Sequence, residues 1–165
     1  MQPKKQAINE QYDKTAGIYN SRYKELQEEK YGIMLEDLQL KEPILDLGSG
    51  TGLLQKFLKI PIIGVDISFA SLKKSHETNV QGDAEILPFK DNSFNTVLSF
   101  TTAQNLDSVE NMLGEIARVL KPNGIAVITI LAKFIGKLSA VEKHFNIREI
   151  KTCGEDIGLV LAPNK

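Results

Sequence analysis

A short apolar stretch runs directly into a turn that contains three glycines, at residues 43–52. Its sequence is Pro-Ile-Leu-Asp-Leu-Gly-Ser-Gly-Thr-Gly, and two leucines follow it. A buried strand, a glycine-rich turn and a helix in this order are typical of a nucleotide-binding unit in an open α/β sheet. A second apolar run ends on Asp66, where a neighbouring strand would present a carboxylate to the hydroxyls of a ribose. Together the two features predict a nucleotide-type cofactor site.

The spacing of the glycines distinguishes two cofactors. A dinucleotide motif G-x-G-x-x-G that began at Gly48 would need a third glycine at position 53, which is Leu53. Asp46 precedes Gly48 by two residues, and its carboxylate would repel a pyrophosphate but attract the ammonium of an amino acid. The pattern therefore favours S-adenosylmethionine over NAD.

Four motifs in one order resemble those of class I S-adenosylmethionine-dependent methyltransferases, of the broad type that includes the ubiquinone and menaquinone methylases. They are residues 46–52, Asp66, residues 82–94 (Gly-Asp-Ala-Glu-Ile-Leu-Pro-Phe followed by Asp-Asn-Ser-Phe) and residues 115–124. One glycine motif alone would be weak evidence, but four motifs in the order and spacing of the family are a poor match to chance. The resemblance spans residues 44–131.

The resemblance implies a role for individual residues. Asp66 would bind the ribose diol, Ile67 would pack on the adenine, and Asp83 with the Ala84 N–H would bind the adenine edge. The alternatives are a plain tight connection for the glycines, a helix cap for Asp66 and an exposed turn residue for Asp83. The full set of predicted cofactor-binding residues is Asp46, Gly48, Ser49, Gly50, Thr51, Gly52, Asp66, Ile67, Asp83, Ala84, Phe100 and Tyr19.

Strand and helix patterns alternate along the chain, which predicts an α/β fold with helices on both faces of a sheet. We expect a doubly wound, mostly parallel, seven-stranded Rossmann-like sheet that ends in an antiparallel hairpin. Ser68 and Ser108 are expected helix N-caps, and residues 122–124 are expected to form a turn. The predicted strands are 43–47, 62–66, 79–82, 95–100, 125–131, 147–152 and 157–162, and the predicted helices are 53–59, 69–77, 109–120 and 138–145.

The segment at residues 100–107 should face the transferable methyl group, and it holds Gln104 and Asn105 where many relatives carry histidines. An amide cannot act as a general base, so no catalytic residue is assigned. We expect His76 and His144 to have surface or structural roles. With a single cysteine and two separated histidines, no metal site is predicted.

The N-terminal residues 1–40 are interpreted as a helical lid segment, and residues 41–165 as the methyltransferase core of a single domain. Tyr12, Tyr19 and Tyr23 are spaced to share one helical face, which suits either packing on the sheet edge or a lid over the cofactor. The mixed Lys and Glu residues at 24–30 are interpreted as a solvated helix face.

Composition limits the partners of the chain. Its 165 residues suit one domain, and a net charge of −1 with no basic run gives no indication of nucleic acid or membrane binding. Lone Cys153 excludes an internal disulfide, and the apolar run at 125–132 is too short to span a bilayer. We expect a soluble cytoplasmic protein without a secretory leader.

The sequence thus predicts an S-adenosylmethionine-dependent methyltransferase that acts by in-line displacement and releases S-adenosylhomocysteine. A small-molecule acceptor is favoured, although the acceptor itself is unidentified. The alternatives are a protein or RNA methyltransferase that needs a partner subunit, and a non-catalytic module that binds the cofactor. A partner protein remains open, as does a homodimer that pairs through the C-terminal hairpin.

Overall fold

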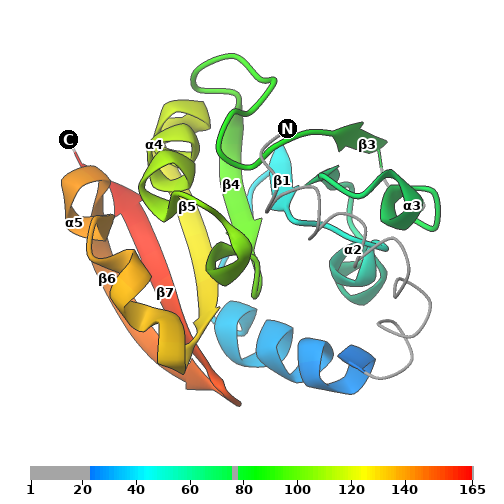
Figure 1. Ribbon diagram of the computed structural model, residues 1–165, viewed down its shortest axis with the longest axis horizontal. Helices are drawn as coiled ribbons and strands as arrows, with labels where there is room; N and C mark the ends of the chain where they lie inside the picture. Colours follow the sequence, from blue (N-terminus) through cyan, green and yellow to red (C-terminus); the bar gives the residue numbers. More distant parts are fainter. Residues whose placement is uncertain (1–22, 76–77, 165) are drawn as a thin grey trace.

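The computed structural model describes residues 23–75 and 78–164, and this part of the chain forms one seven-stranded sheet (Figure 1). The strand order is β3-β2-β1-β4-β5-β7-β6, with β7 antiparallel to both of its neighbours and the other pairings parallel. The predicted doubly wound sheet with a C-terminal antiparallel hairpin is therefore confirmed. The strands are β1 (Ile44–Leu47), β2 (Ile63–Asp66), β3 (Thr78–Gln81), β4 (Phe94–Ser99), β5 (Leu120–Leu131), β6 (Phe145–Cys153) and β7 (Asp156–Pro163).

Helices connect the strands, and two of them begin at the predicted serine caps. The Ser68 hydroxyl accepts a hydrogen bond from Ser71 N at 3.1 Å, and Ser108 Oγ accepts one from Asn111 N at 3.1 Å. Each serine satisfies a backbone donor that the first helical turn leaves unpaired. The helical elements are a helix over residues 23–35, α2 (Leu53–Leu58), α3 (Phe69–Leu72), α4 (Val109–Val119), α5 (Val141–His144) and the 3₁₀ helices η1 (Ala103–Asn105) and η2 (Ala132–Leu138).

Both faces of the sheet are covered, because neighbouring residues of a strand point to opposite sides. In β4, Val97 belongs to the apolar cluster that includes α4, whereas Leu98 belongs to the cluster that includes helix 23–35 and α2. Figure 1 shows α4 and α5 in front of β5 and β7. Continuous apolar strands such as β4 are therefore buried on both sides.

Helix 23–35 lies across the sheet at the lower end of β4 and β7 in Figure 1, and close contacts fix it there. A Cβ on Gly158 of β7 would lie 2.2 Å from Met34 Sδ, so the glycine makes room for the methionine. Lys151 Nζ of β6 donates to Ile33 O at 3.2 Å, near the C-terminal end of the helix. The helix is therefore held by the last two strands of the chain.

Three predicted elements differ from the structure. Residues 122–124 were expected to turn between elements, but they lie inside β5, where the register jumps from Phe94↔Leu120 to Thr96↔Ile125. The helix expected at 138–145 is divided between η2 and the four-residue α5. The helix expected at 69–77 ends at Leu72, where the Asn79 side-chain amide donates to the Leu72 carbonyl at 3.2 Å. Tertiary partners decide these boundaries.

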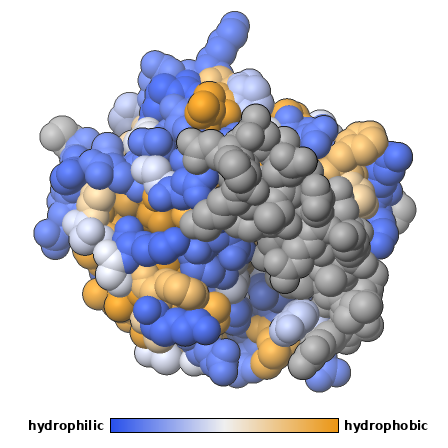
Figure 2. Space-filling view, viewed as in Figure 1, coloured by the Kyte–Doolittle hydropathy of each residue, from blue (hydrophilic) through white to orange (hydrophobic). Residues whose placement is uncertain are grey.

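The surface mixes polar and apolar residues. Figure 2 shows hydrophilic residues spread over the view, with hydrophobic residues gathered at its lower left. Ile147 and Ile150 of the edge strand β6 are among the exposed large apolar side chains. In the part of the chain that the structure describes, no helix has the length and apolar character needed to cross a membrane.

Candidate functional site

A pocket lies at the carboxyl ends of β1, β2 and β4, where the strand order changes direction on either side of β1. This is the position at which open α/β sheets bind ligands. The empty space at the site is about 1080 Å³, with open solvent at its mouth included. Ten of the twelve predicted cofactor residues line it: Asp46, Gly48, Ser49, Gly50, Thr51, Asp66, Ile67, Asp83, Ala84 and Phe100.

The glycine turn after β1 has a backbone that requires glycine. Gly48 has a φ of 83°, and a Cβ there would lie 2.1 Å from Thr102 Oγ1. Gly50 has a φ of 54°, with open space where a Cβ would stand. L-residues rarely adopt these left-handed conformations. The turn is thereby shaped to bring its backbone against the post-β4 loop and to leave room at Gly50.

Asp66, at the end of β2, bridges two parts of the pocket wall. Its Oδ2 accepts a hydrogen bond from Gly50 N at 2.9 Å, and its Oδ1 accepts one from Ser68 N at 2.8 Å. The predicted ribose-binding residue therefore also ties the glycine turn to the start of α3.

Ser49 provides a direct test of whether S-adenosylmethionine suits this pocket. The residue is 7% exposed and lines the pocket, and its Oγ has no hydrogen-bond partner among the described residues. A buried hydroxyl without a partner is unfavourable, so a polar group of a ligand would satisfy it. The carboxylates expected to bind an ammonium and a ribose, Asp46 and Asp66, both belong to residues that line the pocket. The residues present fit the cofactor.

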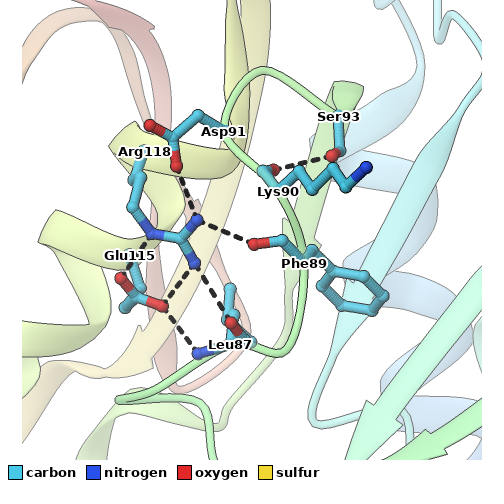
Figure 3. Close-up of polar contacts among 7 residues, drawn as sticks. All are labelled: Leu87, Phe89, Lys90, Asp91, Ser93, Glu115 and Arg118. Carbon is cyan, nitrogen blue, oxygen red and sulfur yellow. Dashed lines mark hydrogen bonds and ion pairs between the residues drawn. The ribbon is translucent and has the colours of Figure 1, made fainter.

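The loop that carries Asp83 and Ala84 is clamped by one arginine of α4, which Figure 3 shows. Arg118 Nη1 donates to Phe89 O at 2.7 Å and lies 2.8 Å from Asp91 Oδ1, and its Nη2 donates to Leu87 O at 3.1 Å. A guanidinium presents its donors in a fixed fork, so it can hold several oxygens at once. We call this set of contacts the Arg118 clamp.

Glu115 completes the Arg118 clamp. Its Oε1 and Oε2 each lie 2.8 Å from the guanidinium, and Oε2 also accepts from Leu87 N at 2.6 Å. The hydrogen bond from Arg118 lowers the pKa of Glu115, and the two carboxylates raise the pKa of Arg118. Both side chains are therefore charged at neutral pH, and the loop is fixed to α4.

Helix 23–35 contributes pocket residues that sequence reasoning missed. They are Gln27 and Tyr31, each 5% exposed. Thr101 and Thr102 after β4 also line the pocket, and they belong to the segment 100–107 that was expected to face the methyl group. The expectation of a solvated face at 24–30 is wrong at Gln27 and at Lys30, which is 8% exposed. The helical spacing of Gln27, Tyr31 and Met34 was the signal that could have revealed a buried face.

Other predicted residues lie outside this wall. Gly52 is the N-cap of α2 and does not line the pocket. Tyr12, Tyr19 and His76 lie outside the described residues. His144 ends α5 and is not among the lining residues. Of the amides expected near the methyl group, Asn105 lines the pocket, whereas Gln104 Nε2 donates to Thr101 O at 2.6 Å.

Comparison with known proteins identifies relatives that are longer than this chain. The chain is 36% identical over 132 residues to an uncharacterized protein of Methanocaldococcus jannaschii, which covers 76% of the chain and 52% of that protein. It is 36% identical over 113 residues to the human mitochondrial arginine-hydroxylase NDUFAF5, a match that covers 63% of this chain and 30% of that protein. It is 30% identical over 151 residues to the malonyl-[acyl-carrier protein] O-methyltransferase of Pectobacterium atrosepticum, a match that covers 84% of this chain and 58% of that protein. The chain spans about half the length of the first of these relatives.

Solved structures share the fold. A complex of the Haloferax volcanii methyltransferase activator Trm112 with a methyltransferase contains a chain that superimposes with a TM-score of 0.79, at 16% identity, over 93% of this chain and 98% of that one. The family model described as a methyltransferase domain matches residues 45–128, which contain the glycine turn, Asp66, Asp83 and the Arg118 clamp. The chain therefore belongs to the S-adenosylmethionine-dependent methyltransferase family.

Proposed function

We propose that this chain transfers a methyl group from S-adenosylmethionine to a small-molecule acceptor. The observation that carries the proposal is the joining of Asp66 to the glycine turn through Gly50 N, which places a carboxylate and a bare backbone in one pocket. The orphaned Ser49 hydroxyl in the same pocket supports it. A dinucleotide is disfavoured because Asp46, also a lining residue, would face its pyrophosphate.

Different residues of the pocket would bind different parts of the cofactor. Asp66 would accept from the ribose hydroxyls, while Asp83 and the Ala84 N–H would bind the adenine edge with Ile67 against its face. Asp46 would attract the ammonium of the methionine part, which the glycine turn would approach closely. When bound, the cofactor supplies a methyl group on a positively charged sulfur.

The remaining work of the chain is positioning. Holding the acceptor, the methyl carbon and the sulfur in line can provide much of the rate enhancement of such a displacement. Gln27 and Tyr31 close the pocket on the side of helix 23–35, and Tyr31 packs edge-on against Phe100 with ring centroids 4.7 Å apart. The wall that these buried side chains form would exclude water from the reacting groups. We propose that residues 1–40 act as the lid of the site.

The acceptor should be nucleophilic before it enters. No histidine, lysine or cysteine is found among the described residues that line the pocket, so these residues supply no basic group of neutral pKa. An acceptor that is ionised at neutral pH, such as a carboxylate, needs no base. The similarity to a malonyl-[acyl-carrier protein] O-methyltransferase supports an oxygen acceptor of this kind.

The buried free thiol of Cys153 supports a cytoplasmic location.

Titration calorimetry tests the cofactor assignment. We expect the purified chain to bind S-adenosylmethionine and S-adenosylhomocysteine with micromolar affinity and to ignore NAD. The Asp66→Ala variant should lose this binding, whereas Glu36→Ala, an exposed residue beyond helix 23–35, should keep it. Binding of NAD in place of the adenosyl ligands would refute the assignment.

A second candidate is action on a larger acceptor, which the similarity to an arginine-hydroxylase favours. Incubating a host extract with methyl-labelled cofactor and fractionating it by size separates the two candidates. Label in small molecules supports the first proposal, and label in protein or RNA supports a macromolecular acceptor. Tight cofactor binding without any transfer would instead indicate a different reaction or a non-catalytic module.

A further inference from the structure

We infer that Lys30 and Asp156 form a buried positioning pair that fixes one wall of the pocket and strengthens the binding of the cofactor. The inference rests on the cofactor site proposed above. Lys30 belongs to helix 23–35, and Asp156 is the first residue of β7. Asp156 is 0% exposed and Lys30 is 8% exposed, so water solvates neither charge well. We call this pair and its two threonines the Lys30–Asp156 network.

The contacts of the network leave both charges compensated. Lys30 Nζ lies 2.9 Å from Asp156 Oδ1 and donates to Thr101 Oγ1 at 3.0 Å. Asp156 Oδ2 accepts from Thr101 Oγ1 at 2.7 Å and from Thr129 Oγ1 at 3.0 Å. Well-packed apolar residues in place of a buried ion pair are often neutral or stabilising, so stability alone is a weak reason for such a pair. A role in fixing one arrangement of the site accounts for it better.

The arrangement that the network fixes is the turn after β4. Thr101 has a φ of 54°, a conformation that β-branched residues avoid. Its N–H donates to Thr129 Oγ1 at 2.9 Å and to Thr129 O at 3.2 Å, and its hydroxyl is held by the ion pair. The next residue, Thr102, lies against Gly48, where no Cβ would fit. The network therefore reaches the glycine turn through two adjacent threonines.

The same network fixes the helix that closes the pocket. Gln27 and Tyr31 line the pocket and stand three residues before and one residue after Lys30. Because neighbouring turns of a helix move together, anchoring Lys30 at Asp156 also anchors these two side chains. Loss of the pair would loosen the wall and the post-β4 turn at once. The expected result is weaker binding of the cofactor by a chain that still folds.

The test compares four variants with the unchanged chain, with S-adenosylhomocysteine as the ligand. Lys30→Met removes one charge, and Lys30→Met/Asp156→Asn removes both, so the double variant leaves no uncompensated carboxylate. Lys24→Met is the matched control, because Lys24 forms an exposed pair with Glu28 at 3.7 Å on the same helix. The readouts are the dissociation constant by calorimetry, amide hydrogen exchange of residues 23–35, and the thermal unfolding midpoint.

We expect the double variant to unfold near the temperature of the unchanged chain, but to bind roughly 10-fold more weakly and to exchange faster in helix 23–35. The control should match the unchanged chain. Thr129→Val, which removes only the hydroxyl that links Thr101 N to Asp156, should weaken binding in the same direction, and it decides the matter if the double variant does not fold. Unchanged affinity in either folded variant would overturn the inference alone. An unchanged chain that does not bind S-adenosylhomocysteine would overturn the proposed function as well.

Discussion

Two polar networks hold different parts of the pocket wall, and they differ in their burial and in the segments that they join. The Arg118 clamp fixes the loop of Asp83 and Ala84, and its arginine side chain is 31% exposed. The Lys30–Asp156 network fixes the wall of Gln27 and Thr101, and its carboxylate is fully buried. The clamp joins two of the sequence motifs, residues 82–94 and 115–124, whereas the network joins the first described helix to the last strand.

The difference teaches how each network uses charge. In the clamp, a planar guanidinium reaches two backbone carbonyls that no other group in the loop satisfies, so geometry matters more than charge. In the buried network, the two charges depend on each other, because either one alone would remain in a poorly solvated interior. Removing one partner should therefore damage the second network far more than the first.

The largest effect is expected for Lys30→Met. This variant leaves the carboxylate of Asp156 buried without its ammonium, and the free energy of unfolding should fall by about 3–5 kcal/mol. Urea denaturation measures it, with Lys24→Met expected to stay within about 0.5 kcal/mol of the unchanged chain. A fall of less than about 1 kcal/mol for Lys30→Met would show that the two charges are not mutually dependent.

Arg118→Met should have the next largest effect. The carbonyls of Leu87 and Phe89 would lose their donor, and the free energy of unfolding should fall by about 1–3 kcal/mol. Binding of S-adenosylhomocysteine should weaken roughly 10-fold as the Asp83 loop shifts. Arg118→Lys keeps the charge without the fork, so full recovery of affinity by lysine would contradict a geometric clamp.

Gly158→Ala tests how helix 23–35 packs on β7 without altering a charged residue. The new methyl group would meet Met34, whose flexible side chain can move only within a packed core, so the cost should be about 1 kcal/mol. Gly32→Ala is the control, because Gly32 lies in the same helix with open space around it, and should stabilise the chain by about 0.5–1 kcal/mol. Thermal unfolding compares the two, and equal effects would argue against the close packing of Met34 on β7.

The smallest effect is expected for the pH dependence of the stability that Glu115 contributes. Because Arg118 lowers the pKa of Glu115 below its ordinary value of 4.5, this carboxylate stabilises the fold above that value and ceases to do so as the pH falls through its folded pKa. The unfolding midpoint of Glu115→Gln should therefore approach that of the unchanged chain as the pH is lowered from about 5 to about 3. A constant difference across this range would show that the ionised form of Glu115 contributes nothing to the clamp.

Local patterns were sufficient to predict much of the site. The glycine turn, Asp66 and Asp83 each follow a strand of a sheet that the alternation of strand and helix predicts to be parallel, so their meeting at the carboxyl ends of the strands was predictable. Ser68 and Ser108 were predicted as caps because capping depends on residues three apart. The bulge at residues 122–124 was not predicted. A proline and a glycine indicate a break in regular structure, but they do not show that the strand pairs with β4 on both sides of the break.

The sequence by itself determined the sheet, the cofactor turn and the carboxylate at the end of β2, because each depends on periodicity and on residues close along the chain. Only the tertiary structure decided that Lys30, in a helix segment rich in charged residues, is buried against Asp156, and that Met34 packs directly on Gly158. Burial and pairing between distant segments depend on how the helix is seated on the sheet. No local sequence pattern determines where helix 23–35 packs on the sheet, and this helix forms one wall of the pocket.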